Sequence, residues 1–90
     1  MSASNSIQRV AVVGTGLIGS SWTAFFLAHG LDVVATDPAP HAERDLRAYV
    51  DRVWPLLVTL GLAPGADRAR LRFEADLSTA LTGVDFVQEN

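Results

Sequence analysis

The sequence contains no cysteine and only two histidines among its 90 residues. The missing thiols exclude disulfide frameworks, thiol catalysis and cysteine-based metal sites, and no metal-ligand spacing is visible. Basic residues are also few, since seven Lys and Arg stand against ten Asp and Glu and give a net charge of −3. The sequence offers no basic patch for a nucleic-acid backbone and no aromatic residues interleaved with cations, so we expect no nucleic-acid partner.

The N-terminal segment also lacks the apolar core of a secretory signal. We expect residues 1–8 to form a short disordered leader and the protein to be cytoplasmic. The stretch from Val10 to Leu31 carries no formal charge and is long enough to cross a membrane. Glycines and hydroxyl residues interrupt it, and its two halves have different periods, so a buried strand followed by a buried helix explains it better. We therefore expect no membrane span.

A glycine-rich turn, residues 14–19 (GTGLIG), follows the apolar run of residues 10–13 and opens a helix-like run. This order of strand, glycine turn and helix is typical of a dinucleotide-binding site. Gly14 would permit the tight turn, Gly16 would let a pyrophosphate approach the backbone, and Gly19 would let the helix lie close to the sheet. The N-terminus of the helix would then offer unpaired N–H groups to the phosphates. The alternative is an ordinary strand–turn–helix in which the glycines serve only the backbone angles.

An acidic residue, Asp37, ends a second apolar run and lies 18 residues after Gly19, near the usual spacing of roughly 20. Its carboxylate would accept hydrogen bonds from the ribose hydroxyls of NAD and repel the 2′-phosphate of NADP. No Arg follows directly to receive that phosphate, and Arg44 and Arg47 are expected on a solvated helix face. The residues therefore favour NAD over NADP. FAD uses the same pattern and stays open at this point.

Hydrophobic periodicity predicts an α/β fold of the Rossmann type. The expected elements are strands at 9–13, 32–36, 71–75 and 84–89, helices at 17–28 and 41–60, and a short turn capped by Ser78 that ends at Leu81. Right-handed crossovers then give a parallel sheet in the order 3-2-1-4. In the second helix a stripe of apolar residues should face the core; its members are Leu46, Tyr49, Val50, Val53, Leu57 and Leu60. Pro55 should kink or interrupt this helix near Trp54.

No catalytic group is apparent. His29 falls at a predicted helix end and His41 at a helix start on the adenosine side, and neither lies where a nicotinamide would bind. The predicted fourth strand ends at the last residue, Asn90, so the sequence would carry the adenosine and pyrophosphate half of a site. We expect residues 9–90 to be a partial domain whose catalytic remainder is absent. A stand-alone module that binds NAD or ADP without catalysis, and an inert fragment, are the alternatives.

The run of residues 10–40 and the ending DFVQEN resemble the N-terminal domain of the L-3-hydroxyacyl-CoA dehydrogenase family. Trp22 after the glycine turn and the VQEN ending are most similar to its carnitine 3-dehydrogenase and lambda-crystallin branches. The resemblance covers residues 9–90. It implies oxidation of a 3-hydroxy acid or 3-hydroxyacyl-CoA to the 3-keto product with NAD. It also implies a helical dimerising domain, hence a homodimer, and a catalytic histidine paired with a glutamate at positions beyond Asn90.

The resemblance also indicates which residues would contact the cofactor. These are Gly14, Gly16, Gly19 and Asp37 by motif, Leu17 and Ile18 through their backbone at the pyrophosphate, and Glu89 at the end of the fourth strand, near cofactor and substrate. No metal ligand and no catalytic residue is assigned within the sequence.

Overall fold

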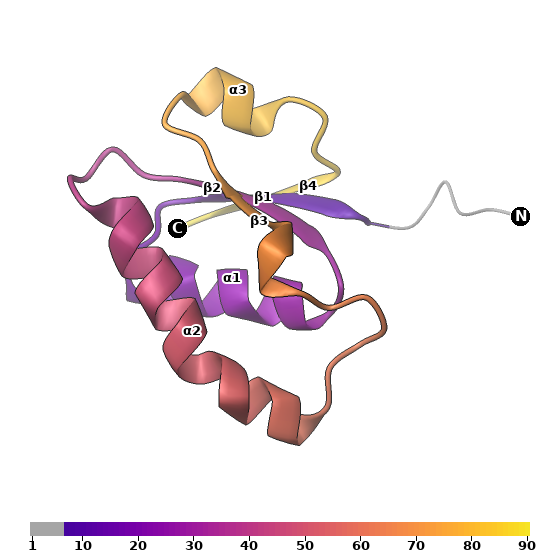
Figure 1. Ribbon diagram of the computed structural model, residues 1–90. Helices are drawn as coiled ribbons and strands as arrows, with labels where there is room; N and C mark the ends of the chain where they lie inside the picture. The colour runs from indigo at the N-terminus through magenta and orange to yellow at the C-terminus, as the bar shows by residue number, and fades with distance from the viewer. Residues whose placement is uncertain (1–6) are drawn as a thin grey trace, which may run out of the picture.

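The computed structural model of the protein describes residues 7–90, which form a parallel sheet covered by helices on both faces (Figure 1). The elements are β1 (Arg9–Val13), α1 (Leu17–Ala28), β2 (Asp32–Thr36), α2 (Ala42–Leu60), a 3₁₀ helix η2 (Arg68–Arg70), β3 (Leu71–Phe73), α3 (Leu77–Leu81) and β4 (Phe86–Glu89). Residues 1–6 of the predicted leader lie outside the described residues.

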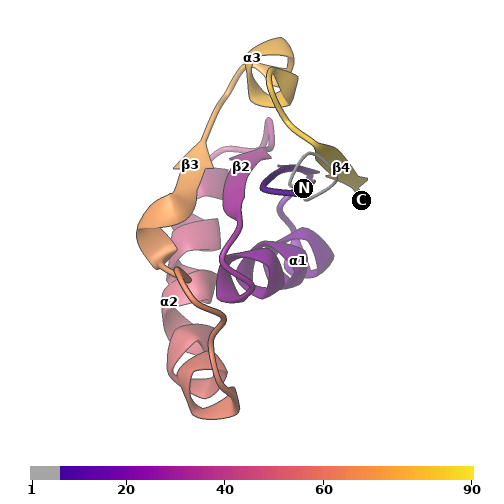
Figure 2. The ribbon, with the colours of Figure 1, turned by 90° about the vertical axis from the view of Figure 1, so that its right-hand side faces the viewer.

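The four strands are hydrogen-bonded in the order β3-β2-β1-β4, and every pairing is parallel. This is the predicted order. Helices α1 and α2 cover one face of the sheet and α3 covers the other, as the end view in Figure 2 shows. In the register, Val13 is paired with Thr36 of β2 and with Glu89 of β4. The carboxyl ends of the three strands β2, β1 and β4 therefore lie side by side.

The core has two parts because β1 and β2 are covered on both faces. On the side of α1 and α2, the valines at positions 10, 12 and 33 pack with buried residues of both helices. On the side of α3, a smaller cluster joins Ala11 and Val34 to Ala80. Both strands consequently read as continuous apolar runs, which is why the sequence showed them clearly.

Helix α2 runs without interruption from Ala42 to Leu60, so of the two effects predicted for Pro55, a kink or an interruption, the interruption is wrong. Pro55 lies on the exposed side of the helix, where the carbonyl that its missing N–H leaves free can bind water. The neighbouring Trp54 and Val50 are buried and hold this part of the helix against the core. Packing of the opposite face therefore outweighs the local cost of the proline.

The apolar stripe of α2 is only partly as predicted. Leu46, Val50 and Trp54, spaced four apart, are the residues that α2 buries. Leu60 is 73% exposed, so its predicted place in the core is wrong, and the sequence reading left Trp54 out of the stripe. The last turns of α2 extend below the sheet (Figures 1 and 2). There Leu60 borders an open hollow that it shares with Leu57 and with Phe25 and His29 at the end of α1.

The short C-terminal elements differ from their predicted bounds in small ways. Strand β3 ends two residues earlier than predicted and lies at an edge of the sheet, and β4 begins two residues later. Helix α3 is capped by Asp76 and not by Ser78, because the Asp76 Oδ2 accepts hydrogen bonds from the Thr79 N–H (2.8 Å) and hydroxyl (2.7 Å).

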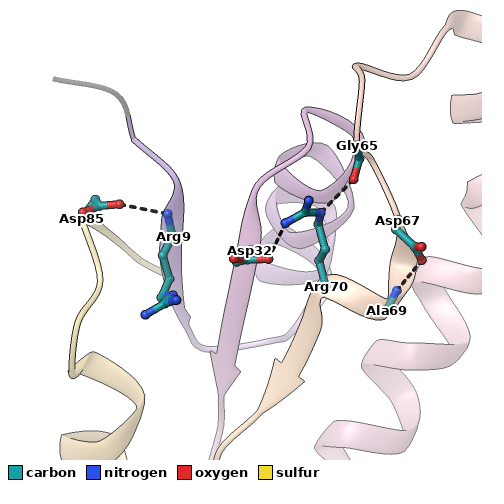
Figure 3. Close-up of polar contacts among 7 residues, drawn as sticks. All are labelled: Arg9, Asp32, Gly65, Asp67, Ala69, Arg70 and Asp85. Carbon is teal, nitrogen blue, oxygen red and sulfur yellow. Dashed lines mark hydrogen bonds and ion pairs between the residues drawn. The ribbon is translucent and has the colours of Figure 1, made fainter. Parts of the chain in front are cut away.

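Polar contacts join the amino ends of the strands (Figure 3). The Asp85 Oδ2 accepts hydrogen bonds from the backbone N–H groups of Gln8 (2.9 Å) and Arg9 (3.0 Å), which ties the approach to β4 to the start of β1. The Arg70 guanidinium binds the Asp32 carboxylate at 2.8 Å and the Gly65 carbonyl at 2.7 Å. These contacts lie at the end of the sheet opposite to the glycine turn, which follows the carboxyl end of β1.

Helix α1 is apolar on nearly all sides, and part of that surface is exposed. Trp22 stacks on Phe26 with ring centroids 5.4 Å apart and meets Phe25 edge-on at 5.7 Å. Trp22 nevertheless remains 37% exposed and Phe25 48% exposed. Trp22 therefore packs against the aromatic rings of its own helix but stays partly open to solvent.

Candidate dinucleotide-binding site

The glycine turn connects the carboxyl end of β1 to α1 and is shaped by two of its glycines. Gly14 has a φ of 91°, which favours glycine, and its N–H donates to the Thr36 carbonyl at 2.9 Å. A Cβ atom on Gly19 would lie 1.8 Å from the Gly14 carbonyl oxygen, which is far inside van der Waals contact. Gly19 thus allows the first turn of α1 to pack against the turn that precedes it.

Gly16 differs from these two because nothing in the protein requires it. A Cβ atom there would meet no atom within 4 Å, and the φ of −65° is accessible to any residue. The open space lies at the N-cap of α1, where the approach of a phosphate group would make a side chain unfavourable. The bare backbone at Gly16 therefore fits the predicted approach of a pyrophosphate.

The N-terminus of α1 provides the positive end of a helix dipole. Its first intrahelical hydrogen bond runs from the Ser20 N–H to the Gly16 carbonyl at 2.8 Å. The N–H groups of Leu17, Ile18 and Gly19 precede that bond and are the orphan donors of the helix. The helix has no side-chain cap and no acidic residue in its first turn. This end is therefore suited to bind an anion, through the backbone positions that the sequence predicted.

The Asp37 carboxylate follows β2 directly and contacts the glycine turn. Its Oδ2 accepts a hydrogen bond from the Thr15 N–H at 2.7 Å, and its Oδ1 accepts one from the Ala39 N–H at 2.8 Å. These two backbone donors, that of Thr15 first, hold the pKa of Asp37 below its ordinary value. The carboxylate is thus ionised at neutral pH, and its remaining lone pairs can accept hydrogen bonds from ribose hydroxyls. The sequence predicted the ribose contact but not the contact with Thr15.

The two cations that could receive a 2′-phosphate are paired with carboxylates of their own helix. The Arg44 guanidinium lies 3.1 Å from the Asp45 carboxylate, and that of Arg47 lies 2.9 Å from Glu43. All four side chains are largely exposed, so these pairs form the solvated helix face that the sequence predicted. The ionised Asp37 and these occupied guanidinium groups favour NAD over NADP.

The end of β4 brings two further residues to the site. Glu89 is exposed and paired in register with Val13, which places it beside the start of the glycine turn. The neighbouring Asn90, which sequence reasoning did not select, donates from its Nδ2 to the carbonyl of Gly14 at 3.0 Å and to that of Val13 at 3.2 Å. No local pattern signals these contacts, because they join residues 76 and 77 positions apart in the chain.

Neither histidine is placed as a catalytic base. The His29 Nδ1–H donates to the Phe25 carbonyl at 2.8 Å, and the two rings lie 4.2 Å apart at the end of α1. His41 is the exposed N-cap of α2 and has a φ of 65°.

Within residues 7–90 no group of three His, Cys, Asp or Glu residues could hold a metal ion. No helix of this part is long and apolar enough to cross a membrane.

Comparison with known families agrees with this geometry. The model of one family, described as "3-hydroxyacyl-CoA dehydrogenase, NAD binding domain", matches residues 9–90. The chain belongs to this family of NAD-binding domains. Its membership confirms the resemblance drawn from the sequence, and it decides for NAD over FAD, which the residues alone had left open. The contacts of individual residues with the cofactor stay predictions.

Relatives of this NAD-binding domain include two enzymes named L-carnitine dehydrogenase. That of Pseudomonas aeruginosa is 53% identical over 90 residues, and that of Bacillus cereus is 52% identical over 86 residues. These alignments cover 100% and 96% of this chain but 28% and 26% of the relatives. The chain therefore spans about a quarter of the length of the relatives that it matches.

A solved structure shows the same fold at lower identity. The crystal structure of FHMPC 5-dehydrogenase, described as an NAD⁺-dependent dismutase, superposes with a TM-score of 0.81 and 36% sequence identity. The match covers 94% of this chain and 28% of that one. The strand order, the glycine turn and the acid after β2 thus occur here in a domain of known NAD-binding type.

Proposed function

We propose that the protein is the NAD-binding part of a dehydrogenase that oxidises the 3-hydroxyl of L-carnitine, or of a similar small 3-hydroxy acid or acyl-CoA, to a ketone. The observation that carries the proposal is the 53% identity with an L-carnitine dehydrogenase over all 90 residues. Bound NAD would accept the hydride from the carbon that bears the hydroxyl. In this proposal residues 9–90 are the NAD-binding domain and residues 1–8 its leader.

The residues of the site have separable roles in this proposal. The turn from Gly14 to Gly19 and the first N–H groups of α1 bind the pyrophosphate. Asp37 accepts hydrogen bonds from the adenosine ribose and excludes a 2′-phosphate by charge repulsion. Glu89, beside the end of β1, lies toward the nicotinamide ribose. The proton of the substrate hydroxyl would go to a base outside residues 7–90, since neither His29 nor His41 lies at this end of β4.

The cellular setting is also part of the proposal. A cytoplasmic location is proposed together with the membership of an NAD-binding family. A homodimer is proposed from the family resemblance.

The proposal is tested with the protein isolated from its natural source. NADH formation is followed with NAD and L-carnitine, D-carnitine, L-gulonate or 3-hydroxybutyryl-CoA as substrate, and the L-carnitine reaction is repeated with NADP. We expect oxidation of L-carnitine with NAD and little reaction with NADP. If another of these substrates is oxidised and L-carnitine is not, that compound replaces L-carnitine as the proposed substrate. Turnover that is faster with NADP would contradict the role of Asp37.

The second candidate is a module that binds NAD or ADP and catalyses nothing. It is favoured by one observation: no histidine within residues 7–90 is placed as a general base. Binding of NAD in a calorimetric titration, together with no oxidation of any of the four substrates, would establish this alternative.

A further inference from the structure

One peptide group of the glycine turn is held from two sides. The carbonyl of Gly14 accepts a hydrogen bond from the Asn90 Nδ2 at 3.0 Å, and the N–H of the next residue, Thr15, donates to the Asp37 Oδ2 at 2.7 Å. In a planar trans peptide the C=O and the N–H point in opposite directions. The peptide between Gly14 and Thr15 therefore joins the end of β4 to the end of β2.

The amide of Asn90 fits this position closely. Its Nδ2 also donates to the Val13 carbonyl at 3.2 Å, and its backbone N–H donates to the same carbonyl at 3.1 Å. A Cβ atom added to Gly19 would lie 3.0 Å from this Nδ2. The bare side of Gly19 thus gives room to the Asn90 amide as well as to the Gly14 carbonyl.

We propose that Asn90 is a positioning residue that fixes the Gly14–Thr15 peptide so that the glycine turn is ready for a pyrophosphate. An amide nitrogen is suited to this because it donates two hydrogen bonds and can satisfy two carbonyls at once. Held in this way, the negative end of the Gly14 carbonyl is turned to Asn90. Hydrogen bonds in such a chain polarise one another, so the Asn90 contact also strengthens the Thr15 donor toward Asp37.

This inference rests on the nucleotide binding in the proposed function. It predicts which ligands lose affinity when the Asn90 amide is removed. Ligands with a pyrophosphate, NAD and ADP, depend on the orientation of the turn. Adenosine lacks the phosphates and depends on the ribose and adenine contacts. Removal of the Asn90 amide should therefore weaken the binding of NAD and ADP and leave the binding of adenosine nearly unchanged. General fraying of β4 would instead weaken the binding of all three ligands alike.

The test compares Asn90→Ala and Asn90→Asp with the control Gln88→Ala. Gln88 lies in β4, two residues before Asn90. Among the described residues its amide has one hydrogen bond, a long one of 3.4 Å to the Asn90 Oδ1, and none to the carbonyls of the glycine turn. Calorimetric titrations with NAD and ADP, and NMR titrations with adenosine, are made on each protein. We expect about tenfold weaker NAD and ADP binding in Asn90→Ala, as for one or two lost hydrogen bonds. Asn90→Asp should bind more weakly still, because a carboxylate would face two carbonyl oxygens. Gln88→Ala should bind all three ligands like the wild type.

A second measurement needs no nucleotide. The Thr15 amide proton reports its hydrogen bond to Asp37, so its NMR chemical shift should follow the acid titration of that carboxylate in the wild type and in Gln88→Ala. We expect this titration to be lost or much reduced in Asn90→Ala. A Thr15 titration unchanged in Asn90→Ala, or equal loss of affinity for adenosine and ADP, would overturn the proposal. A wild-type protein that shows the Thr15 titration but binds no NAD would instead refute the proposed function alone.

Discussion

Asp37 accepts hydrogen bonds from the protein itself, in addition to the contact with NAD that we propose for it. The choice of substitution must therefore separate these two roles. Asp37→Ala would remove the acceptors for Thr15 and Ala39 together with the charge. Asp37→Asn keeps one acceptor oxygen and removes the charge. We expect Asn at this position to weaken NAD binding about tenfold, as for one charged hydrogen bond, and to raise the relative affinity for NADP.

Titration of both proteins with NAD and NADP measures this effect. Arg47→Ala is the matched control, because its guanidinium is paired with Glu43 on the solvated face of α2. The control should not change the preference for NAD. A wild-type protein that binds NADP as tightly as NAD would show that Asp37 does not exclude the 2′-phosphate.

Two glycines of the turn should respond to alanine in opposite ways. Gly16→Ala meets no atom within 4 Å, so the melting temperature should stay near that of the wild type while NAD binding is lost. Gly19→Ala would place its Cβ against the Gly14 carbonyl and should lower the melting temperature markedly. Thermal melts and NAD titrations of both variants separate the two effects. Full NAD affinity in a folded Gly16→Ala protein would argue against a pyrophosphate at this turn.

The residues of the candidate site were predictable where a short spacing defines them. Gly14, Gly16, Gly19 and Asp37 were selected because the chemistry of the turn and the acid depends on residue type at fixed separations. The contacts of Asn90 were not predictable, since they join the end of the sequence to its start. Hydrogen bonds of this kind depend on the strand register, which a single sequence does not specify.

At the scale of one element, α2 offers a direct test of what the fold buries. Leu46 is fully buried, whereas Leu60, predicted to lie in the same apolar stripe, is 73% exposed. Leu46→Ala should therefore lower the free energy of unfolding by about 2–5 kcal/mol. Leu60→Ala should change it by no more than about 0.5 kcal/mol. Urea unfolding of both variants measures the difference, and equal losses would mean that the end of α2 is packed.

The errors in predicting α2 arise because both depend on tertiary packing. Periodicity shows which residues share a face of a helix, but not how far that helix overlaps the sheet. It also cannot weigh the local cost of Pro55 against the burial of Trp54 and Val50. Strands β1 and β2 were predicted to the residue because consecutive apolar side chains have no alternative to burial on both faces.

At the scale of the whole molecule, the carboxyl ends of the strands carry the candidate site and the amino ends carry structural contacts. The strand order followed from the sequence because right-handed crossovers leave few arrangements for these elements. The carboxyl ends carry the glycine turn, Asp37 and Glu89. The amino ends carry hydrogen bonds and an ion pair that join β1 to β4 and β2 to β3. The contacts at the amino ends thus hold the sheet together without taking part in the site, whereas at the carboxyl ends Asp37 and Asn90 also join the strands through the glycine turn.

The carboxylates outside the site lead to a prediction for acid pH. Asp85 accepts hydrogen bonds from the backbone of Gln8 and Arg9, and these bonds hold its pKa below the ordinary value, as those from Thr79 do for Asp76. A carboxyl whose pKa is lower in the folded state stabilises the fold above the unfolded pKa of about 3.9. That stabilisation is lost as the pH falls through the folded value. We therefore expect the free energy of unfolding to decrease steeply below a pH of about 4.

Asp85→Asn isolates the contribution of one carboxylate to this decrease. The variant should be less stable than the wild type at neutral pH and should lose less stability on acidification, because it lacks one of the protons taken up on unfolding. Asp45→Asn removes an exposed carboxylate that, among the described residues, is paired with Arg44 alone, and it should follow the wild-type curve closely. Urea unfolding between neutral and acid pH measures all three proteins. If Asp85→Asn and the wild type lost stability in parallel, the amino ends of β1 and β4 would not be held by the ionised form of Asp85.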